Sequence, residues 1–356
     1  MGKSTYFFLG ANSRKGFSSL YENFADVHGG DFLWLIKGGP GCGKSSFMRK
    51  IGRAAENAGL DVEYIQCSGD PGSLDGVYIP AKCMGYVDAT APHKMDALLP
   101  AAGDAYLDLG AFYKIGELRS AQSVLSAMDR RYKGMYSRIY SLLRAAGELD
   151  AGSIPGLITG EESMSARKRA LGVAEREFGR ATAPGGKEQH RFLSAISCHG
   201  LIRLYGTVDT LCDRVFALDD ELGLADTYLK TLLEEARTRS LDTIACHDPL
   251  YPDRLEALLI PELKLGFVAN RPLFGESPVY DRNVRLDAIV PRERLQLFRR
   301  KMRGTAKMKS ALLDEAVTAL KEAKELHDEI EAVYNPHVDF DGLYELCGRH
   351  IEALLK

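Results

Sequence analysis

The chain has 356 residues, of which 45% are hydrophobic and 27% charged, and its formal net charge is -3. This composition is ordinary for a globular protein, and the length predicts two domains. The charge gives no strong nucleic-acid signal, and no segment has the length and hydrophobicity of a membrane span. Seven cysteines without a C-x-x-C pair indicate reduced thiols, so we expect a cytoplasmic protein.

An apolar strand, a glycine-rich loop and a helix are predicted in succession between residues 32 and 59. Phe32–Ile36 has the pattern of a buried strand, and apolar residues recur at helical spacing after the loop. The loop fits G-x-x-x-x-G-K-[ST], the phosphate-binding pattern called Walker A. We expect a nucleotide to bind at Gly38, Gly39, Pro40, Gly41, Cys42, Gly43, Lys44, Ser45 and Ser46.

The residue types in this loop suit a triphosphate. Gly38, Gly41 and Gly43 can adopt backbone angles that other residues avoid, which lets successive N–H groups curl around the phosphates. Lys44 would neutralise the β- and γ-phosphates, and the Ser45 hydroxyl would bind Mg²⁺. The alternative is a glycine-rich turn that merely precedes an ordinary helix.

Two further strands are predicted at Val62–Ile65 and Met84–Asp88, with a turn-rich connection at Ser68–Asp75 between them. Alternating strands and helices predict an α/β domain with a parallel sheet, in which ligands lie at the carboxyl ends of the strands. Asp88 ends its strand, so we expect it to be the Walker B carboxylate that holds Mg²⁺ together with Ser45. Its alternative role is to cap the following turn.

Thr90 and His93 follow Asp88 within the segment 88–93. Either side chain could sense the γ-phosphate or orient water, which makes both candidates for catalysis beside Lys44 and Asp88. The alternative is a proline-directed turn with a solvated histidine. No arginine finger is assigned, and Arg14 or an arginine of the second half would have to supply one.

Two long segments carry apolar residues at the alternating three- and four-residue spacing of a coiled-coil seam. These residues are Leu118, Ala121, Leu125, Met128, Tyr132, Met135, Ile139 and Leu142 in the first segment, and Leu312, Ala316, Ala319, Ala323, Leu326, Ile330 and Val333 in the second. We expect long helices that cover each core or pack between the two halves, with a partner-binding or lever arm as the alternative. The charged segment Glu161–Arg180 is expected to form a solvated helix.

The chain contains two related halves. Residues 2–11 recur at 186–195, and residues 60–61, 79–80 and 85 recur at 241–242, 260–261 and 266. We therefore expect two tandem domains in contact with each other. The first, 1–180, has the intact loop and a helical insertion. The second, 186–356, has C-terminal helices, and residues 181–185 join the two.

The second half lacks the phosphate loop. A shift of the first loop onto the second half places Asp226 at the position of Lys44, so that a carboxylate stands where phosphate charge would lie. Ala269 falls at the position of Asp88. We expect this copy to be a degenerate structural or regulatory partner that does not hydrolyse nucleotide.

With these motifs the chain resembles a family of tandem P-loop ATP-binding proteins of bacteria, in which two copies of one NTPase unit lie head to tail. The matching patterns are residues 10–12 with 16–17, the loop 37–45, residues 73–77 with 79–80, and residues 88–93. The resemblance covers nearly the whole chain and implies two P-loop NTPase-like domains that bind ATP. Family members commonly keep a glycine-lysine loop in the second copy, and this chain departs from them there.

Our leading hypothesis is an ATP-binding P-loop NTPase that hydrolyses ATP with Mg²⁺ at one site in the first copy. A small-molecule or nucleotide kinase is the second hypothesis, because P-loop kinases share this loop. An ATP-controlled scaffold or switch with little turnover is the third. ATP is preferred over GTP on the resemblance and on the lack of an N-K-x-D pattern, and a further small-molecule or protein partner is left open.

Overall fold

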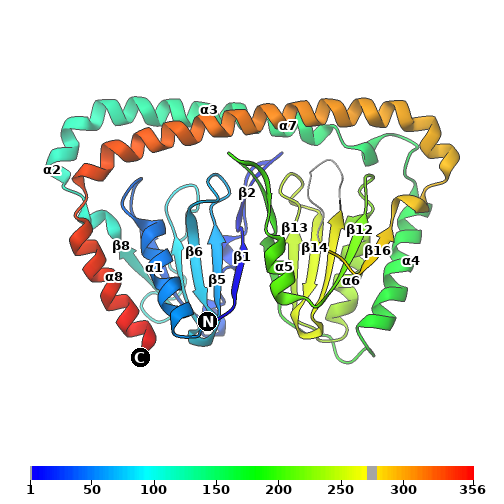
Figure 1. The fold of residues 1–356 in the computed structure, drawn as a ribbon, viewed down its shortest axis with the longest axis horizontal. Helices are drawn as coiled ribbons and strands as arrows, with labels where there is room; N and C mark the ends of the chain where they lie inside the picture. The colour runs from blue at the N-terminus through cyan, green and yellow to red at the C-terminus, as the bar shows by residue number, and fades with distance from the viewer. Residues whose placement is uncertain (1, 271–278) are drawn as a thin grey trace.

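The computed structural model describes residues 2–270 and 279–356, which form two similar α/β units beneath a pair of long helices (Figure 1). Each unit contains one six-stranded sheet. The strands of the first, in spatial order, are β1 (Ser4–Phe7), β5 (Val62–Gln66), β6 (Leu74–Ile79), β7 (Met84–Asp88), β4 (Phe32–Lys37) and β8 (Asp104–Asp108). Those of the second are β9 (Glu188–Phe192), β13 (Thr243–His247), β14 (Leu255–Ile260), β15 (Leu265–Asn270), β12 (Arg214–Asp219) and β16 (Arg282–Arg285). The two orders correspond strand for strand, as the internal duplication predicts.

Each sheet is mixed, so the expectation of a parallel sheet is wrong at one strand. The strand β6 runs antiparallel to both β5 and β7, and β14 does the same in the second sheet. The cause is the length of the connections. A parallel crossover needs about a dozen residues or more, whereas only residues 67–73 and 80–83 separate β6 from its neighbours. The remaining pairs, such as β4 with β7 and β8, are parallel.

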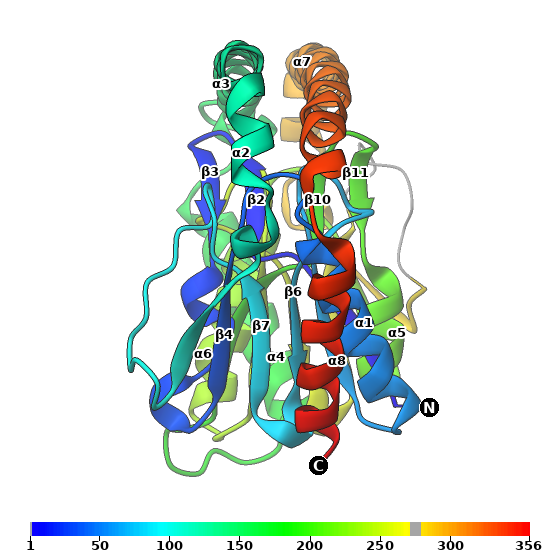
Figure 2. The ribbon, with the colours of Figure 1, turned by 90° about the vertical axis from the view of Figure 1, so that its left-hand side faces the viewer.

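Each sheet is covered by a helix from the other half of the chain. In the first unit, α1 (Lys44–Asn57) packs beside α8 (Phe340–Leu355), the last helix of the chain (Figure 2). Leu343, Cys347 and Leu354 of α8 belong to the same buried core as Phe47 and Ile51 of α1. The core of the first unit is therefore completed by the C-terminus.

The second unit is completed in the corresponding way by α4 (Gly160–Glu177), which packs on α6 (Ala225–Arg237). Ala166, Ala170 and Ala174 of α4 are fully buried in the second core. The expectation of a solvated helix at Glu161–Arg180 is wrong, because small residues at helical spacing give α4 an apolar face beneath its charged one. The helices α4 and α8 are thus exchanged between the two units.

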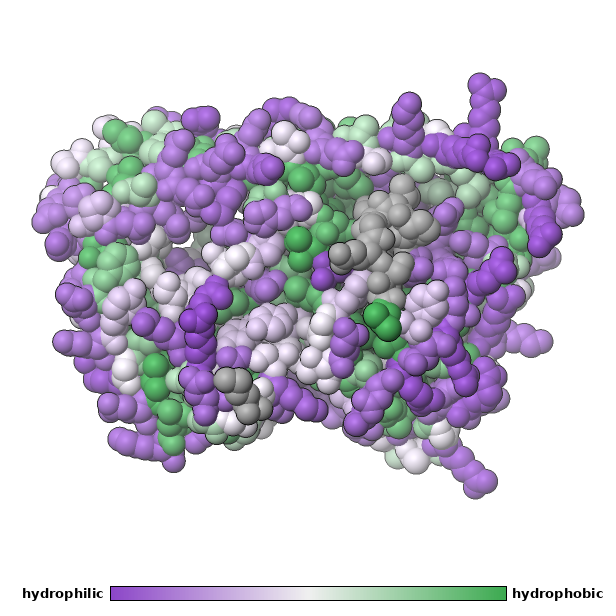
Figure 3. Space-filling view, in the orientation of Figure 1, coloured by the Kyte–Doolittle hydropathy of each residue, from purple (hydrophilic) through white to green (hydrophobic). Residues whose placement is uncertain are grey.

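Two long helices bridge the units. The helices α3 (Gln122–Glu148) and α7 (Arg292–Tyr334) run side by side across the tops of both sheets (Figures 1 and 2). Their seam buries Ile139 and Leu143 against Ala316, Ala319 and Leu320. The coiled-coil pattern therefore corresponds to packing between the halves, while the outward faces of these helices are mainly hydrophilic (Figure 3).

The sheets meet at their edge strands. Phe8 and Phe192, which occupy equivalent positions in the two copies, exchange backbone hydrogen bonds of 2.9 and 2.8 Å. Nearby lie the hairpins β2 (Gly10–Ser13) with β3 (Gly16–Ser19) and β10 (Ser194–Ser197) with β11 (Gly200–Arg203), and the helix α5 (Tyr205–Leu211). None of the helices in the described ranges combines the length and hydrophobicity that a membrane crossing requires.

Candidate functional site

The glycine-rich loop connects β4 to α1 at the carboxyl edge of the first sheet. Gly41 and Gly43 have φ angles of 69° and 85°, which residues with a side chain rarely adopt. Gly43 directly precedes α1, and the first N–H groups of an α-helix have no partner within the helix. The loop therefore combines positive-φ glycines with N–H groups at a helix start that have no partner within the helix, two features that anion-binding turns share.

Lys44 and Asp88 lie together, as the sequence predicts for a nucleotide site. The Lys44 ammonium donates to the carbonyls of Gly38 and Gly39 at 2.8 and 2.9 Å, and it lies 3.6 Å from Asp88 Oδ2. The Lys44 and Asp88 side chains are only 15% and 12% exposed. The pairing of β4 with β7, which sets Ile36 opposite Asp88, produces this proximity.

Ser45 follows Lys44 and Thr90 lies two residues after Asp88, and both form hydrogen bonds next to this pair. The backbone N–H of Leu74 donates to Ser45 Oγ at 2.9 Å, which joins the start of α1 to β6. Thr90 donates to Asp88 Oδ1 from its N–H at 2.8 Å and also from its hydroxyl. Asp88 thus caps the turn after β7, as its alternative role predicts, and it also faces Lys44. Its role as a magnesium ligand stays a prediction. Ser46, by contrast, is exposed.

His93 does not contact Lys44, and its solvated alternative is wrong. The ring is 7% exposed and packs against the rings of Phe17 and Tyr21. Its Nε2 lies 3.4 Å from Asp75 Oδ2, which also accepts a 2.8 Å hydrogen bond from the Tyr21 hydroxyl. Among the described residues, no partner lies within hydrogen-bonding distance of the buried His93 Nδ1.

Asp75 is a site residue that the sequence interpretation missed. It is the second residue of β6, next to Leu74, whose N–H donates to Ser45. Burial raises the pKa of the Asp75 carboxyl, while His93 lowers it and Asp88 raises it further. Its presence in the matched segment 73–77 was the available signal. Because the sequence predicts a turn-rich connection that ends at Asp75, this side chain is expected to be solvated and not to belong to a buried site.

Three residues that are distant in the sequence contact the glycine-rich loop: Tyr113, and Glu331 and Asn335 at the end of α7. We call these three residues the cover. The Gly41 N–H donates to Glu331 Oε1 at 3.2 Å, and a β-carbon at Gly41 would lie 2.5 Å from the side chain of Asn335. The Tyr113 hydroxyl donates to the Pro40 carbonyl at 2.7 Å. These residues escaped the sequence interpretation because 290 positions separate Gly41 from Glu331.

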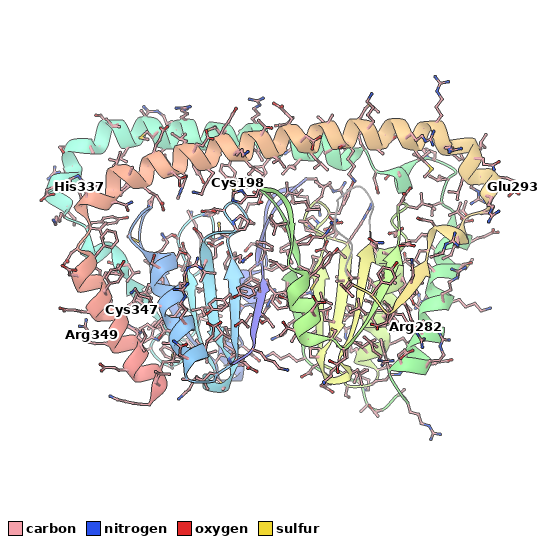
Figure 4. All side chains as sticks on the ribbon, in the orientation of Figure 1. Cys198, Arg282, Glu293, His337, Cys347 and Arg349 are labelled. Carbon is pink, nitrogen blue, oxygen red and sulfur yellow. The ribbon has the colours of Figure 1, made fainter. Side chains whose placement is uncertain are left out.

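The cover is held where α7 turns into α8, near the labelled His337 (Figure 4). The backbone N–H of Lys114 donates to the His337 carbonyl at 2.8 Å, and that of Asp339 donates to the Phe112 carbonyl at 2.9 Å. The rings of Tyr113 and Tyr334 also lie 5.4 Å apart. The end of α7 is therefore anchored to the segment that follows β8, next to the loop.

The corresponding loop of the second unit is one residue shorter, which corrects the expected alignment. It spans residues 220–224 between β12 and α6, against 38–43 in the first unit. Asp226 stands at the position of Ser45 rather than Lys44, because Leu255 N–H donates to Asp226 Oδ1 as Leu74 N–H donates to Ser45 Oγ, each at 2.9 Å. Ala225 then occupies the position of Lys44.

The Asp220 carboxylate accepts hydrogen bonds from the backbone of this second loop. Asp220 is 1% exposed and accepts hydrogen bonds from the N–H groups of Leu222, Leu224 and Ala225 at 3.1, 2.9 and 2.9 Å. Three of the N–H groups in this loop and at the start of α6 that an anion could bind are therefore satisfied by the protein itself. Ala269 lies opposite Leu218 in the pairing of β12 with β15, where the first unit has Asp88 opposite Ile36.

Arg14 is engaged at the junction of the units. Its guanidinium lies over the ring of Tyr251, 5.2 Å from the centroid, and 3.8 Å from Glu148. An arginine of the second half, Arg191, also reaches the first unit, where it is buried and bonds Glu63 at 2.9 Å. Neither contact is to the glycine-rich loop, so neither arginine acts as a finger in this conformation.

Two further groups of possible metal ligands occur within the described ranges, each with ligand atoms within 4.8 Å of one another. One contains Asp70, Cys198 and His199, where the β10–β11 hairpin meets the first unit (Figure 4 labels Cys198). The other contains residues 327, 328 and 331 on α7. In the first group, Lys324 already lies 3.4 Å from Asp70 and balances its charge.

Comparison of the chain with protein-family models, with curated proteins and with solved structures gave no match. The similarity to tandem P-loop ATP-binding proteins therefore stays a prediction from the sequence motifs.

Proposed function

We propose that this protein is an ATP-binding P-loop NTPase that hydrolyses ATP, with Mg²⁺, at a single site in its first unit. The observation that supports it is the arrangement of Lys44 in a positive-φ glycine loop, 3.6 Å from a carboxylate at the end of the neighbouring strand. The loop N–H groups would hold the phosphates, and Lys44 would exchange the Gly38 and Gly39 carbonyls for phosphate oxygens.

Ser45 and Asp88 fit a magnesium ion, because both present oxygen atoms beside the phosphate loop. When bound, the ion supplies charge neutralisation for the leaving phosphate. Thr90 keeps the Asp88 carboxylate oriented through its two hydrogen bonds. Asp75 and His93, one strand away, are candidates for ordering water, because the buried His93 Nδ1 has hydrogen-bonding capacity to spare.

The second unit has a structural or regulatory role in this proposal. Asp220 satisfies the loop N–H groups, Ala225 replaces the lysine, and Ala269 replaces the magnesium-binding aspartate. A phosphate group would have to displace a buried carboxylate from its three hydrogen bonds, which is unfavourable. Loss of all three functions together supports a unit without nucleotide chemistry.

A second candidate, an ATP-controlled switch with little turnover, is favoured by the contact of Glu331 with the loop. A triphosphate at Gly41 would compete with this carboxylate for the same N–H group. Since Glu331 lies on α7, which extends over both units, nucleotide binding would move the end of a helix shared by the whole molecule.

The proposal is tested by Mg²⁺-dependent binding and hydrolysis of ATP, with Lys44→Ala compared with Lys50→Ala on the same helix. We expect Lys44→Ala to abolish turnover and Lys50→Ala, an exposed residue of α1, to retain it. Full turnover in Lys44→Ala would refute the site. Binding without turnover in the wild-type protein would favour the switch, and transfer of phosphate to an added small acceptor would favour a kinase.

A further inference from the structure

A groove lies at the beginning of α7, above the second sheet and far from the glycine-rich loop. We call it the α7 groove; its volume is about 440 Å³. Its apolar lining includes Leu222 of the shortened loop together with Leu295 and Met302 of α7. The groove lies at the end of α7 that Figure 4 marks with Glu293. This size is within the range of small-molecule sites.

One face of α7 forms the wall of the groove. Arg292, Arg299 and Arg303 line it together with Leu295 and Met302, and these positions recur at the three- and four-residue spacing of a single helical face. The three arginines are exposed, whereas Leu295 and Met302 are partly buried. The face is therefore apolar at its base and cationic at its edge.

The three arginines of the groove outnumber the two carboxylates, of Glu221 and Asp287, that line it. Within residues 2–270 and 279–356, no carboxylate lies within 4.0 Å of their guanidinium groups. Arg294, on another face of the same turns, instead pairs with Glu162 at 2.7 Å. Repulsion among unpaired cations around one cavity favours the entry of an anion.

Two acids, Glu221 and Asp287, line the groove beside the arginines, and Asp219 and Asp220 lie near Asp287. Asp220 holds three loop N–H groups, and Asp287 accepts from the Glu221 N–H at 3.0 Å. Asp219 accepts from the side-chain amides of Asn270 and Asn283 at 3.0 and 2.8 Å. Burial, followed by the proximity of Asp220, raises the pKa of Asp287 to about 7, so its charge is partly suppressed at neutral pH.

We propose that the α7 groove binds a small organic anion with an apolar body. A carboxylate, phosphate or sulfonate group would contact Arg299 and Arg303, and the apolar body would pack on Leu222, Leu295 and Met302. Arginine suits these planar or tetrahedral anions because its guanidinium donates hydrogen bonds in a fixed fork. This site is independent of the nucleotide site, since its residues belong to the second unit and the other end of α7.

The probe for a test is 8-anilinonaphthalene-1-sulfonate, whose fluorescence rises when its aromatic body leaves water. We expect saturable binding to the full chain. The double variant Arg299→Glu with Arg303→Glu should weaken it by about tenfold or more, because two charge-assisted contacts are lost. The matched control, Arg300→Glu with Lys301→Glu, makes the same charge change on exposed positions outside the groove lining and should bind as the wild type.

Equal weakening in both double variants would overturn the proposal, since it would reflect only the overall field of the helix. Unchanged binding in the groove variant, or binding that does not saturate, would also overturn it. A second measurement uses methyl-labelled methionine and octanoate as the ligand. The Met302 methyl resonance, assigned through Met302→Leu, should shift, while that of the exposed Met308 should not; the opposite result places the ligand elsewhere.

Discussion

Replacement of Glu331 by glutamine should increase the affinity of the first unit for ATP. The Glu331 carboxylate accepts the Gly41 N–H at 3.2 Å, in the loop where a phosphate oxygen would bind in our proposal. A carboxylate and a triphosphate cannot share this position without repulsion. Glutamine keeps the length and hydrogen-bonding geometry of the side chain but removes its charge, so the variant isolates the electrostatic part of the competition.

The magnitude follows from the contact. A hydrogen bond to a charged group contributes about 1.5–3 kcal/mol, and the Glu331 side chain is 38% exposed, which lowers the value through screening by water. The glutamine still accepts the bond more weakly, so we expect a gain of about 1–2 kcal/mol in ATP binding, or about 5–30-fold in Kd. Relief of repulsion acts in the same direction.

The assay is calorimetric titration of ATP and Mg²⁺ into the wild type, Glu331→Gln and the control Glu329→Gln. Glu329 is exposed on the same turn of α7, so its replacement makes the same change of net charge without touching the loop. A Kd for Glu331→Gln within about twofold of the control would refute the competition. Weaker binding would show that Glu331 belongs to the nucleotide site instead of opposing it.

Three other changes have expected outcomes. Asp88→Asn should raise the Mg²⁺ concentration needed for ATP turnover, measured by metal titration, because an amide is a poorer magnesium ligand; an unchanged requirement would remove Asp88 from the metal site. Leu343→Ala should lower the free energy of unfolding, measured in urea titrations, by about 2–5 kcal/mol. The reason is that this fully buried residue anchors α8 on the first unit. A loss under about 1 kcal/mol would mean that α8 is not docked. In Asp287→Asn, the free energy of unfolding should fall less between about pH 4 and about pH 7 than it does in the wild-type protein. The folded state raises the pKa of Asp287 to about 7, so it favours the protonated form, and the stability present at low pH is lost as pH rises through that value.

Features that depend on neighbouring residues could be predicted from the sequence. The strand β4, the glycine loop and α1 follow from an apolar run, positive-φ glycines and helical periodicity, all within 26 residues of one another. The coiled-coil seam can be predicted for the same reason, because its apolar residues recur every three or four positions along each helix. The antiparallel direction of β6 can also be predicted, because the connections on either side of this strand are too short for a parallel crossover.

Features that depend on distant partners could not be predicted in this way. The alanines of α4 show that the helix buries a face, but the periodicity does not identify what that face packs against. The exchange of α4 and α8 is decided by the shape of the two cores. The same limit applies to the site, where Asp88 was found from its strand but Glu331 required the path of α7 across the molecule.

The exchange of helices links the fold of the second unit to the candidate site of the first. Asp220 satisfies three N–H groups of the second unit's loop, those of Leu222, Leu224 and Ala225, so these donors need no bound anion. Loss of its fold would have a wider effect. The helices α7 and α8 follow the second sheet in the chain, and they supply both Glu331 above the first loop and the side chains that complete the first core. The glycine-rich loop and the core of the first unit therefore depend on helices that the second half of the chain contributes.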